Sequence, residues 1–359
     1  MSLTYKQILW IFILLLIPIA VFSQASRYHY IPPIAASETI AGRGNSNADD
    51  MSAQYFYITT ASTESVTYTI YPLPISPATS FTGVISKLSP AELRVDNINR
   101  YLADNAGYGQ LFITASQSGT PMSNKGFYIE ADAPIYVNLR YRASAQGSGL
   151  VSKGEAALGR SFRNGGFTNG KPTDDYYLNF ASVMAVEAGT TTVTFSDIFS
   201  MIPESSGYPD IERIIETYDT DGNIADIVVE LDQFETFVVA MKAAKWGDVE
   251  DPPTGNLADQ GLPYPIANRD ALVGMSIESS KNIAVISGGA NGSMTETQTG
   301  RDHGIDQIVG LDKAGTEFIF IKGDPNEGDD YDNAIIIAHE DDTRVFLNGE
   351  TVATATLAA

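Results

Sequence analysis

The stretch Gly126-Phe-Tyr-Ile-Glu-Ala-Asp-Ala-Pro-Ile-Tyr-Val137 occurs again, in altered form, as Gly274-Met-Ser-Ile-Glu-Ser-Ser-Lys-Asn-Ile-Ala-Val285. Gly, Ile, Glu, Ile and Val keep their places, and the two stretches begin 148 residues apart. Self-similarity at a long period indicates duplicated structural modules. The sequence therefore predicts an internal repeat in this chain.

Two shorter matches follow in the same order. Leu158-Gly-Arg-Ser-Phe162 parallels Ala314-Gly-Thr-Glu-Phe318, and residues 185–190 parallel residues 338–343. The offsets are 156 and 153 residues, close to the first. We interpret the three matches as two similar modules in tandem.

The module limits follow from these matches and from composition. The stretch 247–265 is rich in Pro and Gly, as linkers are. The second module has too few residues to close, so we expect it to be truncated and the chain to be a fragment. The expected segments are a signal peptide at 1–23, an N-terminal β region at 24–125, a first module at 126–246, a linker at 247–265 and a second module at 266–359.

Short runs of alternating apolar and polar residues fill the sequence from Ser26 onward, bounded by Gly, Asn, Asp and Ser. This period of two is typical of strands with one buried face. We expect hairpins at 53–71, 127–142, 183–195, 226–241 and 335–348. Residues 209–217 suit a helix and a bulged strand equally well.

The predicted fold is therefore all-β, with tandem antiparallel β-sandwich-like modules. A hairpin cannot bury its apolar face alone, and stacking sheets face to face solves this problem. A β-propeller is the alternative, because one long repeat could hold several blades.

The first 23 residues have the layout of a cleavable signal peptide. Lys6 gives a positive start, and an uncharged apolar run extends from Ile8 to Phe22. Small residues at Val21 and Ser23 fit a cut before Gln24. The run is shorter than the roughly 20 residues that span a bilayer. We expect no transmembrane segment after cleavage.

Composition excludes some classes of protein. The chain has no cysteine, so it has neither disulfide bonds nor a lipid-modified cysteine. The net charge of −22 disfavours nucleic-acid binding, which requires basic surface. An acidic surface favours solubility and can also attract divalent cations.

Five stretches, 29–33, 150–154, 157–162, 178–185 and 300–313, together carry a resemblance. They resemble the N-terminal region of large secreted Bacteroidota proteins that carry a gliding-motility-associated C-terminal domain, a sorting signal for type IX secretion. From about residue 126 the chain also has the elements Ile-x-Ser/Ala-x-x-Pro/Asn-Ile-x-Val, Asp-His followed by Gln-Ile, Gly-x-Glu-Phe and Ala-x-x-Asp-x-Thr-x-Val. These elements are similar to the domain named after the N-terminus of the IgGFc-binding protein. The resemblances imply a secreted or outer-cell-surface protein with an adhesive role. A shared module does not by itself carry a ligand with it.

One histidine lies among carboxylates, in Arg301-Asp302-His303 with Asp306. A carboxylate can orient an imidazole for acid–base work. The nearest hydroxyl in sequence is Ser293, and there is no Gly-x-Ser-x-Gly elbow for a nucleophile. We therefore predict no catalytic residue here, and a hydrogen-bonded loop instead. His29 and His339 are isolated and expected to be structural.

Oxygen-bearing residues surround a glycine in a stretch that is the one candidate for a cofactor, a calcium ion. Hard cations prefer such ligands in tight loops. The glycine falls at the fourth position and not the sixth, so the match to an EF-hand loop is partial, and a plain Asp-Gly turn explains it equally. The candidate ligands are Asp219, Asp221, Asn223, Asp226 and Glu230. The acidic run 324–332 is a weaker candidate.

Tyr176, Tyr177 and Trp246 could stack on a sugar, although tyrosine is also ordinary in strands. The predicted function is a noncatalytic adhesion or interaction region that binds an unknown surface protein or glycan. The alternatives are a carbohydrate-active enzyme or its accessory module, and a structural spacer.

Overall fold

The computed structural model describes the chain in ten segments, separated by gaps. These are residues 24–35, 53–94, 109–113, 117–142, 147–166, 178–198, 225–242, 272–292, 302–320 and 334–358. No helix in these segments is long and apolar enough to cross a membrane. The predicted signal peptide, the candidate helix at 209–217 and the linker at 247–265 lie outside them.

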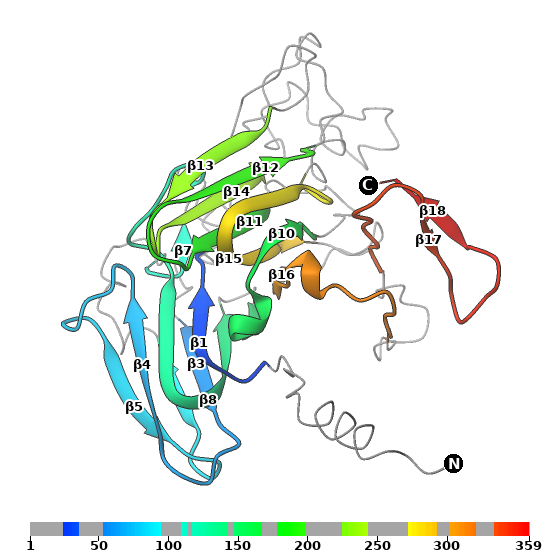
Figure 1. Ribbon diagram of the computed structural model, residues 1–359. Coiled ribbons are helices and arrows are strands. Elements are labelled where there is room, and N and C mark those ends of the chain that lie inside the picture. The colour runs from blue at the N-terminus through cyan, green and yellow to red at the C-terminus, as the bar shows by residue number, and fades with distance from the viewer. Residues whose placement is uncertain are drawn as a thin grey trace, which may run out of the picture.

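Seven strands form the first sheet, which we call unit one (Figure 1). They are β1 (Ser26–Ile31), β3 (Ala53–Thr59), β4 (Val66–Pro72), β5 (Phe81–Ile85), β6 (Ala91–Arg94), β8 (Phe127–Arg142) and β9 (Gly147–Ser152). The first half of β8 pairs with β1 and β4, and its second half pairs with β3 and β9. One long strand therefore belongs to two half-sheets.

Seven further strands form unit two. They are β10 (Gly159–Arg163), β11 (Leu178–Ala185), β12 (Thr191–Ser196), β13 (Ile227–Leu231), β14 (Thr236–Lys242), β15 (Ser276–Gly292) and β16 (Asp302–Ile308). Here β15 pairs with β10 and β12 through its first half and with β11 and β16 through its second. The strand order matches that of unit one throughout, so the predicted repeat is a duplicated sandwich-like unit.

The two units agree in register as well as in order. Ser26 lies opposite Ile135 in unit one, and Gly159 lies opposite Ile283 in unit two. Both pairings break at the same place, after the first residue of the short strand. Ile135 and Ile283 belong to the first pair of matching stretches, so the repeat predicted from that pair is confirmed.

The bend in each central strand is held in the same way. In β8 the Asp132 carboxylate accepts a hydrogen bond from the Thr67 N–H at 3.1 Å. In β15 the Ser280 hydroxyl accepts one from the Thr192 N–H at 2.9 Å. Pro134 also lies in the bend of β8 and has no N–H to pair. At the bend, where the central strand passes from one half-sheet to the other, a side-chain oxygen thus accepts the hydrogen bond that a backbone carbonyl would otherwise accept.

Several predicted hairpins are wrong in one respect. Residues 127–142 form one bent strand of 16 residues and not two strands. The strands within 53–71, 183–195 and 226–241 exist, but each consecutive pair belongs to opposite half-sheets and does not pair with itself. Alternating apolar and polar residues show that a strand has one buried face. They do not show which strand it pairs with, and here most strands pair with the central strand of their unit.

Strand pairing also groups the chain differently from the expected limits. Unit one spans Ser26–Ser152 and unit two spans Gly159–Ile308. In each unit the central strand comes second to last, before β9 or β16. The sequence matches instead predict that modules start at 126 and 266. The limits of independently folding domains remain a prediction.

The apolar core is continuous between the units. A short parallel pair, β2 (Ile34–Ala35) with β7 (Phe112–Ile113), lies in this interface. Ile34 and Phe112 share one buried cluster with Phe180 and Ile286 of unit two. A second cluster fills the inside of unit two and includes Phe162. Unit two is therefore packed on both faces.

Candidate functional site

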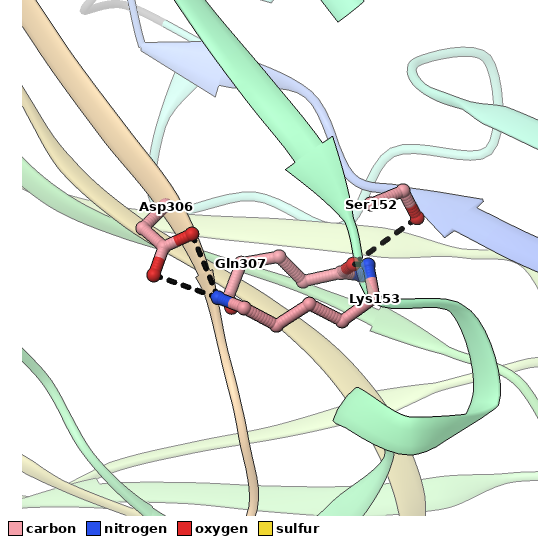
Figure 2. Close-up of polar contacts among 4 residues, drawn as sticks. All are labelled: Ser152, Lys153, Asp306 and Gln307. Carbon is pink, nitrogen blue, oxygen red and sulfur yellow. Dashed lines mark hydrogen bonds and ion pairs between the residues drawn. The ribbon is translucent and has the colours of Figure 1, made fainter. Parts of the chain in front are cut away.

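One group of polar contacts between the units lies at the end of β9 (Figure 2). A second pairs the backbones of Met122 and Thr236. Gln307, on β16 of unit two, is fully buried. Its Oε1 accepts a hydrogen bond from the Lys153 N–H at 2.6 Å, and its Nε2 donates to the Tyr30 carbonyl at 3.0 Å. One side chain of unit two thus satisfies two backbone groups of unit one. We call Ser152, Lys153, Asp306 and Gln307 the joint.

An ion pair covers the solvent side of the joint. The Lys153 ammonium lies 2.7 Å from both carboxylate oxygens of Asp306 and also donates to the Gln307 carbonyl. The Asp306 side chain is 64% exposed. Exposed pairs contribute on the order of 0–1 kcal/mol, so the buried amide contacts of Gln307 hold the joint more than the ion pair does.

His29 lies behind the joint, in the corner of unit one. Its Nε2 is 3.1 Å from the Ile135 carbonyl oxygen and 3.2 Å from that of Ser26. Carbonyl oxygens only accept, so Nε2 carries the proton of the neutral ring. Burial lowers the pKa of His29 to about 4, against the opposing effect of those carbonyls. The ring is therefore neutral at pH 7.

The Ser152 hydroxyl lies between two hydrogen-bond acceptors but has only one proton to donate. Ser152 Oγ lies 3.0 Å from His29 Nδ1 and 3.1 Å from Gln307 Oε1. A hydroxyl has a single proton, which can serve one of these acceptors at a time. Neutral Nδ1 needs it, while Gln307 Oε1 already has the Lys153 N–H. His29 is thus buried and hydrogen-bonded, and the Ser152 hydroxyl connects it to the joint.

A row of tyrosines crosses the outer face of unit one. Tyr71 on β4 and Tyr30 on β1 both lie opposite Tyr128 on β8. The ring centroids are 5.8 Å apart for Tyr71–Tyr128 and 5.4 Å for Tyr30–Tyr128. Tyr28 stacks on Tyr128 at 6.4 Å. We call these four residues the tyrosine row.

Glu130 and unit two fix the tyrosine row. The Tyr71 hydroxyl donates to Glu130 at 2.9 Å and the Tyr128 hydroxyl donates at 3.1 Å. Burial first, and the Glu130 charge second, raise the pKa of Tyr128 above its ordinary range. Burial and the nearby Glu155 raise the pKa of Tyr30 to about 12. These phenols stay protonated donors at neutral pH.

Unit two contributes one ring to this face. Phe234 sits in the turn between β13 and β14 with a φ of 67°. A left-handed conformation is uncommon for a residue with a large side chain. It places the Phe234 ring 5.1 Å from that of Tyr128. The tyrosine row therefore touches both units.

The predicted site residues fall largely elsewhere. Asp219, Asp221 and Asn223 lie outside the described residues, as do Ser293, Arg301, the run 324–332 and the aromatic candidates at 176, 177 and 246. Asp226 and Glu230 are exposed at β13. Within the described segments there is no group of three or more metal-ligating side chains. Calcium binding therefore remains a prediction.

Asp302, His303 and Asp306 of the predicted Asp–His stretch all lie on β16, which is a strand and not the predicted loop. Asp306 forms an ion pair with Lys153. His339 is exposed, far along the chain. The Lys153–Gln307 contact could not be predicted from the sequence pattern, because the two residues are 154 positions apart.

The fold and the joint define a class of protein: tandem β-sandwich units coupled into one body. Residues 147–359 match the family described as IgGFc binding protein. The match covers more than half of the chain, so the chain belongs to the IgGFc binding protein family. That family consists of non-enzymatic binding domains found in extracellular proteins. No curated protein and no solved structure matches the chain.

Proposed function

We propose that this chain is a noncatalytic extracellular interaction region that binds a protein partner through the tyrosine row. The observation that carries the proposal is the difference between the outer faces of two units with one topology. Tyr71, Tyr128 and Tyr30 of unit one correspond by register to Ser196, Ser276 and Arg163 of unit two.

The chemistry of the row suits protein recognition. Tyrosine is enriched at protein interfaces because it offers a large ring and a polar hydroxyl with few rotatable bonds. The Glu130 contacts hold two of the hydroxyls in place before any partner arrives. A fixed surface loses less entropy on binding than a mobile one.

The joint supports the same function. Because the units are coupled by buried contacts, Phe234 stays beside Tyr128 and the row keeps its shape. A spacer would require coupled units but no aromatic row on one of them. This difference favours interaction over spacing.

Export completes the proposal. The layout of residues 1–23 supports cleavage before Gln24, and the sequence resemblances support a Bacteroidota surface protein sorted by type IX secretion. N-terminal sequencing of the protein recovered from the medium tests the first point. A mature chain that still begins at Met1 would contradict it.

Binding is tested with variants that make unit one resemble unit two. We would replace Tyr28 and Tyr71 by serine, the residue found at both equivalent positions, 161 and 196. The probes are the Fc fragment of immunoglobulin G and a panel of surface glycoproteins, each with and without enzymatic deglycosylation. Tyr57→Ser, which copies Ser182, is the matched control on the other half-sheet.

The outcomes separate the alternatives. Saturable binding that survives deglycosylation and falls at least tenfold in the double variant, but not in Tyr57→Ser, supports the proposal. Binding that disappears on deglycosylation would indicate a glycan ligand. Binding that is equal in all variants would move the site away from the tyrosine row.

A further inference from the structure

The residues after β16 repeat the beginning of unit two. A short 3-10 helix, η6 (Leu311–Lys313), follows β16 as η3 (Gly154–Ala157) follows β9. The next residue has nearly the same backbone angles in both places: φ −66° and ψ 140° at Leu158, and φ −67° and ψ 135° at Ala314. In sequence, Gly315–Phe318 then corresponds to Gly159–Phe162.

The next matching element is a turn. Gly189 has a φ of 73°, and its sequence counterpart Asp342 has a φ of 60°. A non-glycine residue rarely adopts this conformation unless the turn requires it. The antiparallel pair β17 (Thr343–Val345) and β18 (Ala355–Leu357) follows, where unit two has the pair β12–β13. We call residues 311–320 and 334–358 together the unit-three segment.

Apolar side chains of this segment are exposed where their counterparts are buried. Phe318 is 67% exposed, whereas Phe162 is fully buried. Ile336 and Phe346 are 47% and 45% exposed, whereas their counterparts Val183 and Val193 are fully buried. Apolar side chains that are exposed here and buried in the complete units mark a surface that is free to bind another chain segment. Figure 1 shows the β17–β18 hairpin standing apart from both units.

The complete units show what covers these positions. In unit two Ile277 of the central strand lies opposite Phe162, Ser279 lies opposite Val193, and Val285 lies opposite Val183. Unit one places Ile129 and Val137 in the same way. Among the described residues after Ile308, none forms a long strand of this kind.

We propose that the unit-three segment binds a β-strand of the repeat's central type, antiparallel and about as long as β8 and β15. Those strands have 16 and 17 residues and share the spacing Ile-x5-Ile-x-Val. The occupant is a further strand of this type, which none of the described residues after Ile308 supplies. The central strands of a second copy do not fit, because each is already held by four partners in its own unit.

Charge adds a specificity to this site. Glu130 and Glu278 occupy the same place in the two central strands, opposite Tyr28 and Ser161. The corresponding residue of the unit-three segment is Glu317. Like charges directly opposite on neighbouring strands are destabilising. The matching central strand therefore carries a neutral or basic residue where β8 and β15 carry glutamate.

The test uses the full chain and labelled synthetic peptides. One peptide copies residues 274–289, a second carries Glu278→Lys, and a control carries Ile283→Asp with Val285→Asp. Fluorescence anisotropy measures binding. We expect saturable binding of the copy, at least tenfold weaker binding of the control, and binding of the Glu278→Lys peptide that is tighter by about twofold to fivefold.

Protein variants locate the site. Phe318→Asp with Phe346→Asp should weaken peptide binding at least tenfold and leave the unfolding temperature unchanged, because both side chains are exposed. Leu88→Asp, at a position 92% exposed on unit one, is the matched control and should bind normally. Equal binding by the Phe318/Phe346 variant would overturn the proposal. So would self-association of the unmodified chain that this variant abolishes, since the occupant would then be a second copy.

Discussion

The same corner is polar in unit one and apolar in unit two. His29 and Ser152 are hydrogen-bonded at 3.0 Å in unit one. By register, Phe162 and Ile308 take their places in unit two, where both pack in the apolar cluster. The same fold thus accommodates either a polar or an apolar pair at this corner. The polar pair is found in unit one, where Gln307 of unit two makes its contacts.

The comparison shows what a joint requires. Gln307 brings an amide that needs polar partners, so the receiving corner must offer a backbone N–H, a carbonyl and a hydroxyl. The corner of unit two makes no such contact, and a phenylalanine fills it. The choice of histidine or phenylalanine therefore marks which corner accepts a neighbour.

Emptying the apolar corner should have the largest effect. Phe162→Ala leaves a cavity in the core of unit two, and we expect a loss of about 3–5 kcal/mol in the free energy of unfolding. Chemical denaturation measures this loss. A loss below about 1 kcal/mol would mean that the corner does not support the unit.

Protonation should weaken the polar corner selectively. The pKa of His29 is about 4 in the folded state and 6.5 in the unfolded state, so the unfolded chain binds the proton first as the pH falls. Stability from His29 is complete above pH 6.5, declines from there to about pH 4, and is then lower by about 3 kcal/mol. Unfolding measured against pH should show this decline, and His29→Phe should remove it.

Cutting the joint at its amide should cost somewhat less. Gln307→Leu keeps the volume but removes the partners of the Lys153 N–H and the Tyr30 carbonyl. Each unpaired buried group costs about 1–3 kcal/mol, and partial entry of water reduces the sum, so we expect about 2–3 kcal/mol. Gln307→Glu is the control that keeps the acceptor for Lys153. If Gln307→Leu unfolds like the unmodified chain, the hydrogen bonds of Gln307 do not stabilise the folded protein.

The ion pair over the joint should have the smallest effect. Asp306→Asn removes the charge opposite Lys153 at a side chain that is 64% exposed. We expect a change below about 1 kcal/mol, decreasing further at high salt because exposed charges are screened. A larger, salt-independent change would place the strength of the joint in the ion pair.

The repeat was predictable because its register residues are themselves conserved between copies. Ile135 and Ile283 both lie opposite the first residue of a unit. The three matches, however, do not relate the same two copies. The match at 126 relates unit one to unit two, whereas the matches at 158 and 185 relate unit two to the unit-three segment. Because the three matches have similar offsets in sequence, they were interpreted as two copies although they involve three.

The pairing of strands was not predictable from alternation. Alternating residues reveal that 53–59 and 66–72 are strands, but not that β8 separates them into different half-sheets. The joint was also hidden, because Ser152, Lys153 and Gln307 are ordinary polar residues far apart in sequence. Duplication offered one signal: the polar His29 stands where the repeat has Phe162.

Because the central strand comes late in each unit, the earlier strands are synthesised well before the strand with which they pair. About 100 residues separate β1 from its partner β8, and a ribosome adds roughly 5–20 residues per second. The earlier strands of a unit therefore wait on the order of 5–20 s for the strand that joins them. During that interval they are open to chaperones or to export machinery, and each unit becomes folded only when its central strand and the strand after it have been made.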